Sequence, residues 1–341
     1  MNQLSEHVYI TSVLNPSMRT FDVTMHTEYG TSYNSYIIKG GDKIALVEAS
    51  HASFAAYHFD NITEVIGDAA PDYLILNHCE PDHSGSVAKL LDRYPNITIV
   101  TSKAGSLYLK QITNRDDYQL ITPQDGDSLS LGDVSLRFIS APMLHWPDTM
   151  FSWLEADRVL FCGDFLGAHF CEPQLIDSKV LDTHDYRKAV KQYYDAIMSP
   201  FAEYVLAGLD KMAALDVLYA ANSHGPVLTR GVMLEWVQEQ YRAWSSRWPS
   251  VNLRIPVFYA SAYGNTMRLA KTIAHGITDV LPDAEVTCYS INEHSLEFLS
   301  QALNNSDAFL VGSTTINRDA VPPIWNLMAS IEAVGIAKRP S

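Results

Sequence analysis

The feature that most constrains this chain is a short polar segment, residues 77–85, which directly follows an apolar run at residues 73–76. The segment reads Asn77-His78-Cys79-Glu80-Pro81-Asp82-His83-Ser84-Gly85 and holds two imidazoles and two carboxylates within six residues. The apolar run predicts a buried strand, and reacting groups are commonly carried on loops at strand ends. Because buried charges without partners cost several kcal/mol each, a bound metal is the simplest compensation for such a cluster.

Three later segments offer further metal ligands, each just after a stretch that is predicted to form a strand. They contain His145, Asp164 and His224. We expect one sheet edge to gather these side chains beside the 78–83 loop. Two metal ions a few ångströms apart form a recognised catalytic arrangement, and a carboxylate can bridge them with its two oxygens. The predicted assignment is His78, Glu80 and His145 on one ion, Asp82, His83 and His224 on the other, and Asp164 as the bridge.

The alternative for each isolated residue is a structural role. A lone histidine before glycine, or a lone aspartate after a strand, is more often a turn or capping residue than a ligand. Four candidate ligands in six residues are harder to explain in that way. Histidines without such neighbours are therefore assigned no function: His51, His58, His169 and His184.

Composition excludes several classes of protein. A chain of 341 residues is expected to hold two domains, and its net charge of −15 argues against non-specific nucleic-acid binding. There is no apolar run long enough to span a membrane, and the first residues do not resemble a signal peptide. The cysteines form no C-x-x-C pair, which predicts a reduced, cytoplasmic protein and excludes a rubredoxin or zinc-ribbon module within these residues.

Residues 1–250 are predicted to form the first domain, which mixes strands and helices. Hairpins are expected at residues 33–47 and 151–162, the first with a glycine turn and the second through residues 155–158. Further strands are predicted at 74–77, 97–101 and 136–140. Helices are predicted at 84–93, 103–112, 186–197 and 232–245, with Asp185 as a candidate cap for the third.

A proline and small polar residues at 248–252 indicate a domain boundary, and residues 251–341 are predicted to form the second domain. A strand at 255–260 leads through a polar turn into a helix that ends near residue 280. Two more strands follow at 285–290 and 308–312, with helices at 298–304 and 324–334. Alternation of strands and helices predicts a parallel, doubly wound α/β sheet.

Two polar turns of the second domain are candidate phosphate-binding and ring-binding loops. Hydroxyls and free N–H groups at a helix N-terminus favour a phosphate, and Gly264 permits close approach of the backbone. Small polar residues in such turns are also common helix caps, which is the competing interpretation. The candidate residues are Ser261, Ala262, Tyr263, Gly264, Asn265 and Thr266, followed by Ser313, Thr314, Thr315, Ile316 and Asn317.

Taken together, these segments resemble the flavodiiron proteins, also called A-type flavoproteins, a family that includes the rubredoxin:oxygen oxidoreductases. The resemblance covers essentially the whole chain and rests on the 78–83 loop, the residues 143–147, the turns at 163–165 and 223–226, and the flavodoxin-like start. It implies a metallo-β-lactamase-like αββα domain with a non-haem diiron centre, followed by a flavodoxin-like domain that binds FMN. Glu80 stands where metallo-β-lactamases carry a second imidazole, and this harder ligand suits iron better than zinc.

The resemblance also implies a set of partners and further site residues. Electrons would pass through FMN from a separate donor such as rubredoxin or a flavin reductase, within a head-to-tail homodimer or a dimer of dimers. Residues matching the family's small-molecule pocket are His26, Tyr193 and Tyr194. A flavodoxin-like sheet has five strands in the order 2-1-3-4-5. Since only three are readable here, we expect an incomplete flavodoxin-like domain.

Three functions are compatible with these residues. The first is reduction of O₂ to water, of NO to N₂O, or of both, at the diiron centre. The second is hydrolysis of esters, lactones or thioesters by a dizinc site on the same scaffold, which Glu80 disfavours. The third is metal binding without catalysis, if the second domain does not hold FMN.

Overall fold

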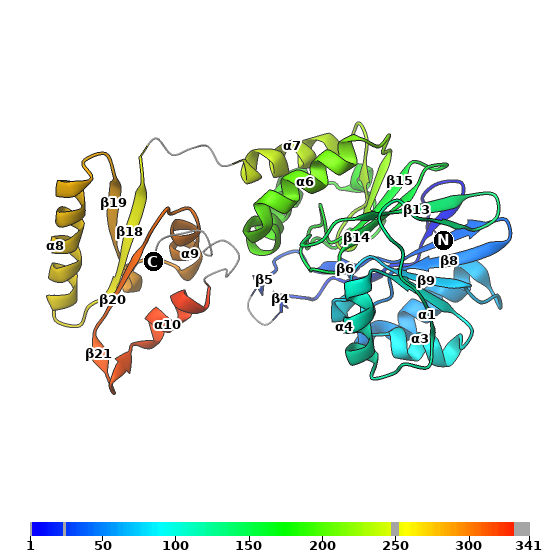
Figure 1. The fold of residues 1–341 in the computed structure, drawn as a ribbon, viewed down its shortest axis with the longest axis horizontal. Coiled ribbons are helices and arrows are strands. Elements are labelled where there is room, and N and C mark those ends of the chain that lie inside the picture. Colours follow the sequence, from blue (N-terminus) through cyan, green and yellow to red (C-terminus); the bar gives the residue numbers. More distant parts are fainter. Residues whose placement is uncertain (1, 23–24, 247–251, 331–341) are drawn as a thin grey trace. The chain divides into compact units, whose positions relative to one another are not determined.

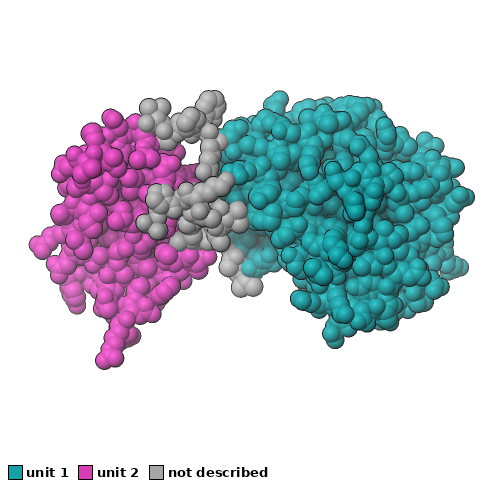
Figure 2. All heavy atoms as spheres, viewed as in Figure 1, with its two compact units in different colours: residues 1–246 teal, residues 247–341 magenta. Residues whose placement is uncertain are grey.

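The computed structural model describes residues 2–22, 25–246 and 252–330. The chain divides into two compact units, residues 1–246 and 247–341, which are described separately below (Figure 2). The domain boundary expected at residues 248–252 falls almost entirely outside the described residues. Among the described residues, no helix combines the length and the apolar character that crossing a membrane requires.

The first unit is built on two mixed β-sheets. The first sheet has strands in the spatial order β1 (Asn2–Gln3), β2 (Val8–Ile10), β7 (Tyr36–Gly40), β8 (Lys43–Val47), β9 (Tyr73–Leu76), β10 (Thr98–Thr101) and β11 (Gln119–Ile121). The second has the order β12 (Ser128–Ser130), β13 (Ser135–Ser140), β14 (Met150–Leu154), β15 (Val159–Gly163), β16 (Tyr219–Asn222) and β17 (Leu228–Thr229). Parallel pairing occurs from β8 to β11 and between β15 and β16.

Helices cover the outer face of each sheet, which gives a four-layered αββα arrangement (Figure 1). The first sheet is covered by α1 (Ala55–Ile66), α3 (Val87–Arg93) and α4 (Lys103–Thr113). The second is covered by α5 (Thr183–Tyr193), α6 (Ala202–Ala213) and α7 (Leu234–Ser245). Two short antiparallel strand pairs complete the unit: β3 (Val13–Asn15) with β6 (Thr31–Tyr33), and β4 (Thr20–Phe21) with β5 (Met25–His26).

Three hydrophobic clusters hold these layers together. The central one fills the space between the two sheets and includes Val47, Ile75, Val100, Phe138 and Phe161, all nearly or fully buried. The other two lie between each sheet and its helices. Full burial of a large aliphatic or aromatic side chain contributes about 1.5–3 kcal/mol, so these layers supply most of the driving force for folding.

Most predicted elements are present, with some corrections. Asp182, and not Asp185, caps α5, because its side chain accepts a hydrogen bond from the Asp185 N–H at 3.0 Å. The helix therefore begins earlier than expected, and a π-helical turn at Tyr194–Met198 follows it. The predicted helix at 84–93 is divided into α2 (Pro81–Ser84) and α3. Helices α1 and α6 were not predicted.

In the second unit, a parallel sheet has the spatial order β19 (Glu285–Ser290), β18 (Arg254–Ala260) and β20 (Leu310–Ser313) within residues 252–330. In chain order this is 2-1-3, the beginning of the flavodoxin-like order. The helices are α8 (Asn265–Val280), α9 (Leu296–Asn304) and α10 (Pro322–Ala329). A helix was predicted at 324–334, and residues 331–334 of that range lie outside the described residues.

The alternation of side chains along β18 explains why helices cover both faces of this sheet. Val257 and Tyr259 pack with Ala270 of α8 on one face. Phe258 and Ala260 pack on the other face with residues of α9 and α10 (Figure 1). Successive strand residues point to opposite faces, so a strand that is apolar throughout must be covered on both sides.

Candidate metal centre

The 78–83 loop is shaped by its position between β9 and a single helical turn. Strand β9 ends at Leu76, and Pro81 occupies the first position of α2, where its missing N–H costs nothing. This turn places Asp82 and His83 side by side. Glu80 precedes the turn and is held there by the backbone, since its carbonyl oxygen accepts hydrogen bonds from the N–H groups of His83 and Ser84.

The second sheet supplies the other three candidate ligands. His145 lies in the loop between β13 and β14, Asp164 follows β15, and His224 follows β16. Gly225 has a φ of 79°, and a Cβ there would lie 2.5 Å from the carbonyl oxygen of Ala168, so glycine is required directly after His224. The expectation that a single sheet edge gathers all the candidate ligands is therefore wrong, because strand ends of both sheets meet here.

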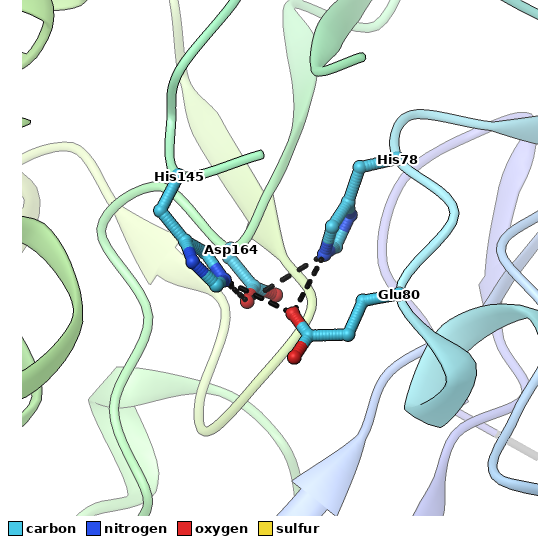
Figure 3. A group of neighbouring side chains, drawn as sticks. All are labelled: His78, Glu80, His145 and Asp164. Atoms are coloured by element: carbon cyan, nitrogen blue, oxygen red, sulfur yellow. Dashed lines mark hydrogen bonds and ion pairs between the residues drawn. The ribbon is translucent and has the colours of Figure 1, made fainter. Parts of the chain in front are cut away.

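The first group of side chains consists of His78, Glu80, His145 and Asp164, which point toward one another (Figure 3). His145 Nε2 lies 3.0 Å from Glu80 Oε2 and 3.1 Å from Asp164 Oδ2. His78 Nε2 lies 3.6 Å from each of the same two oxygens. Two nitrogens and two oxygens thus converge on one small volume.

The second group consists of Asp82, His83 and His224. Asp82 Oδ2 lies 3.1 Å from His83 Nε2 and 3.0 Å from His224 Nε2, and the two nitrogens are 3.2 Å apart. Asp164 faces this group with its other oxygen, Oδ1, at 3.1 Å from His83 Nε2 and 3.7 Å from His224 Nε2. Asp164 therefore directs one carboxylate oxygen to each group, which is the geometry of a bridge.

The donor set fits a pair of metal ions. Several buried side-chain atoms of the two groups have no hydrogen bond of good geometry among the described residues, including Glu80 Oε2, both carboxylate oxygens of Asp82 and Asp164 Oδ1; three of these oxygens form the ion pairs given above. Leaving buried polar atoms unsatisfied costs about 1–3 kcal/mol each, more when they are charged. Imidazole with carboxylate is a donor set that suits iron, zinc and copper, and the three carboxylates favour the harder of these.

Electrostatics between imidazoles and carboxylates shift the pKa values of several of these side chains. Burial lowers the pKa of His83 and His145, but the neighbouring carboxylates outweigh it and raise the pKa to about 10 and about 9, respectively. Burial likewise raises the pKa of Glu80 and Asp164, and the facing imidazoles overcome it and lower the pKa of both. A metal ion entering the centre would displace the protons that these histidines carry.

Contacts behind the ligands orient them. His224 Nδ1 lies 2.8 Å from the carbonyl oxygen of Ser32, which leaves Nε2 facing the centre as a metal ligand requires. Glu48 is fully buried behind the 78–83 loop, and its Oε1 accepts a hydrogen bond from the Asn77 N–H at 2.9 Å. Desolvation raises the pKa of Glu48 to about 7, while His78 and His83 act in the opposite direction.

The structure separates the three residues matched to the small-molecule pocket. Tyr193 is buried with its ring centroid 6.0 Å from that of His224, and its hydroxyl has no hydrogen-bond partner among the described residues. Tyr194 turns away, because its hydroxyl bonds to Ser245 Oγ at 2.9 Å in the core beside α7. His26 is exposed on β5, and none of the contacts described for residues 2–22 and 25–246 joins it to the ligands.

One histidine to which the sequence assigned no function, His169, lies beside the centre. His169 is buried, and its ring centroid lies 4.8 Å from that of His224 and 5.0 Å from that of Tyr193. Its Nδ1 lies 2.9 Å from Thr31 Oγ1, and its Nε2 has no hydrogen-bond partner among the described residues. Its position five residues after Asp164 was the one available signal, and a single histidine in a loop is weak evidence.

In the second unit, the two polar turns meet at the ends of β18 and β20. The Ala262 N–H donates to Thr314 Oγ1 at 3.2 Å, and the hydroxyls of Thr266 and Thr314 are 3.5 Å apart. Helix α8 begins after Gly264 without a side-chain cap, which leaves its first N–H groups available to an anion. Thr315 and Ile316 instead form an exposed hairpin strand, β21 (Thr315–Ile316), paired with β22 (Asp319–Ala320) around a turn that contains Asn317.

Comparison with known proteins places these observations in a family. The model for the ODP family beta-lactamases matches residues 31–225, more than half of the chain. The flavo-diiron protein FprA2 of Clostridium acetobutylicum is 46% identical over 99% of this chain and 85% of its own length. The chain belongs to the flavodiiron protein family. The resemblance inferred from the sequence is thereby confirmed.

Further similarities extend across the family. The flavodiiron chain resembles the anaerobic nitric oxide reductase flavorubredoxin of Vibrio vulnificus, with 33% identity over 89% of this chain and 62% of that protein. The solved structure of rubredoxin oxygen:oxidoreductase from Desulfovibrio gigas superimposes with a TM-score of 0.79 at 22% identity, over 97% of this chain and 82% of that one. This likeness confirms the predicted fold class, a metallo-β-lactamase-like αββα domain followed by a flavodoxin-like sheet.

Proposed function

We propose that this flavodiiron protein is an oxidoreductase that reduces O₂ to water, NO to N₂O, or both, at a diiron centre held by the seven clustered side chains. The observation that carries the proposal is the position of Asp164, whose two oxygens face two separate groups of ligands. The names of relatives, one an oxygen oxidoreductase and another a nitric oxide reductase, support this class of reaction.

The residues of the chain would perform distinct tasks in this reaction. When bound, the two irons supply electrons and open coordination positions for the small substrate. His78, Glu80 and His145 hold one ion, and Asp82, His83 and His224 hold the other, with Asp164 between them. The buried, unpartnered hydroxyl of Tyr193 and Nε2 of His169 lie beside His224 of the second group and are available for hydrogen bonds to the small substrate.

The second unit is proposed to hold FMN, the source of further electrons. The free N–H groups at the start of α8 and the hydroxyls of Ser261 and Thr266 would hold the phosphate, and residues 313–317 would lie beside the ring. A separate protein, rubredoxin or a flavin reductase, is proposed to reduce the FMN. We further propose a cytoplasmic location and a head-to-tail homodimer or dimer of dimers.

Metal and flavin analysis tests this proposal directly. The purified protein is expected to contain about two irons and one FMN per chain, and after anaerobic reduction it should consume O₂ or NO. Measurement requires metal analysis, flavin absorbance and gas electrodes. Two zinc ions per chain with activity on esters or thioesters would instead establish the hydrolytic function, and a loaded, reduced protein that consumes neither gas would defeat the proposal.

The adjacent tyrosines provide a matched pair of variants. Tyr193→Phe removes a hydroxyl beside the metal centre and is expected to lower turnover at least about tenfold, since a positioned donor in other enzymes contributes roughly 100-fold or more. Tyr194→Phe removes the bond to Ser245 and should leave turnover unchanged, at a cost of about 1 kcal/mol in the free energy of unfolding. Equal turnover in both variants would contradict the assigned role of Tyr193.

A further inference from the structure

Asp148 is a buried carboxylate that none of the proposed chemistry uses. It is 1% exposed and lies at the end of the loop that carries His145. Its Oδ2 accepts a hydrogen bond of 2.8 Å from the backbone N–H of Cys79, the residue between His78 and Glu80. One carboxylate therefore connects the loop of His145 to the loop that holds His78 and Glu80, two further candidate ligands of the same metal ion.

Neighbouring contacts hold this connection in place. The Met150 N–H donates to the carbonyl oxygen of Asn77 at 2.8 Å, so the two loops are joined on both sides of His78. A Cβ at Gly105, in the first turn of α4, would lie 3.2 Å from Asp148 Oδ2. The carboxylate thus packs against a helix N-terminus, where a negative charge is favoured.

The second group of ligands is oriented by different contacts. His224 is held through Nδ1 by the carbonyl oxygen of Ser32, and the Gly225 N–H donates to Ser32 Oγ at 2.9 Å. His83 is held by the helical turn α2 and by the Ala49 N–H, which donates to its carbonyl oxygen at 2.9 Å. No contact among the described residues joins Asp148 directly to either of these histidines.

We propose that Asp148 is a positioning residue that sets the geometry of one half of the metal centre, the half formed by His78, Glu80 and His145. This inference rests on the proposed diiron function. Loss of the Asp148 carboxylate removes the hydrogen bond to the Cys79 N–H. The two loops are then no longer held in the same position relative to each other. The ion held by His78, Glu80 and His145 then binds more weakly, while the ion held by Asp82, His83 and His224 is retained.

An anaerobic calorimetric titration of metal-free protein with Fe²⁺ alone tests the proposal. Wild-type protein is expected to bind two equivalents. Asp148→Ala should retain one step near its original affinity and weaken the other by about 10- to 100-fold, the usual effect of removing a partner that orients ligands. Asp148→Asn, which keeps an oxygen acceptor for the Cys79 N–H, should fall between the two and serves if the alanine variant does not fold.

Asp157 offers a matched control. It is also a buried carboxylate, and its Oδ2 accepts a hydrogen bond of 2.8 Å from the His7 N–H, but it lies before β15, at the opposite end of that strand from Asp164. Asp157→Ala should lower the stability of the metal-free protein and leave both iron-binding steps intact. A comparable change in iron binding in this variant would show that any loss of stability suffices.

Double variants identify which ion is affected. Asp148→Ala combined with His145→Ala should bind iron no more weakly than His145→Ala alone, whereas Asp148→Ala combined with His224→Ala should weaken both steps. Two unaltered steps in Asp148→Ala, or equal weakening of both, would overturn the positioning role. Wild-type protein that does not bind two equivalents would refute the proposed diiron function itself, which is a separate outcome.

Discussion

Substituting alanine for Asp164 is expected to eliminate turnover of O₂ and NO and to prevent both metal ions from binding in their native positions. Asp164 is the side chain whose Oδ2 lies 3.1 Å from His145 Nε2 and whose Oδ1 lies 3.1 Å from His83 Nε2. Its loss removes a ligand from both ions at once and leaves imidazoles facing one another. We expect a decrease of more than about 100-fold in affinity for iron, beyond the range typical of residues behind the ligands.

A matched control distinguishes this effect from a general loss of a buried carboxylate. Asp177 is 2% exposed, and its Oδ2 accepts hydrogen bonds from the N–H groups of Thr229 and Met233 at 2.7 and 3.1 Å. Asp177→Asn should lower the free energy of unfolding by about 1–3 kcal/mol and leave two irons bound. Retention of two irons and of turnover by Asp164→Ala, measured by metal analysis and gas consumption, would remove the bridge from the mechanism.

The metal-free protein is expected to lose stability as the pH rises above about 6.5. The folded-state pKa of His145 is raised to about 9 and that of His83 to about 10, whereas an unfolded histidine titrates near 6.5. Groups with a raised pKa stabilise the folded state fully below the unfolded value, and this contribution disappears as the pH passes the folded value. For His145 alone the change corresponds to about 3 kcal/mol.

The carboxylates of the centre act in the opposite direction. The pKa values of Glu80 and Asp164 are lowered, so their contribution is present above about pH 4 and is lost as the pH falls. Urea unfolding of metal-free protein should therefore show maximal stability between about pH 5 and 6.5. A stability that stays constant from pH 6.5 to 9 would contradict the pairing of protonated histidines with carboxylates.

Metal binding should reverse the alkaline trend. The ligands bind metal in their deprotonated form, so binding releases protons and its apparent affinity increases with pH. Loaded protein should consequently keep its stability between pH 6.5 and 9, where metal-free protein loses it. His145→Gln supplies the control, since removal of this imidazole should make the loss of stability of the metal-free protein less steep in the same pH interval, with the contribution of His83 remaining.

The metal centre could be predicted from the residue types and their local spacing alone. Four candidate ligands in six residues are a dense signal, and the three later ones each follow a predicted strand. Tyr193 and Tyr194 show the limit of this approach. Tyr193 ends α5 and Tyr194 begins the π-helical turn that follows, and their different directions follow from how this segment packs on the second sheet and on α7. Adjacent residues of a helix point about 100° apart, so sequence position alone does not determine which one reaches the centre.

The contacts that residues behind the candidate ligands make were equally unpredictable from the sequence. His169 and Asp148 are ordinary residues in loops until the two sheets bring them to His224 and to Cys79. The missed helix α6 has the same explanation: its apolar face is recognisable once the second sheet is present to cover it.

The sequence by itself determined the family, the αββα and flavodoxin-like fold classes and the identity of seven candidate ligands, because these depend on local spacing and on strand-end position. The tertiary structure alone decided that strand ends of both sheets supply those ligands, which tyrosine accompanies them and which carboxylate joins their loops. These depend on contacts between residues up to about 190 positions apart, such as His224 with Ser32. Such contacts form when the edges of two sheets meet, an event that local sequence does not encode.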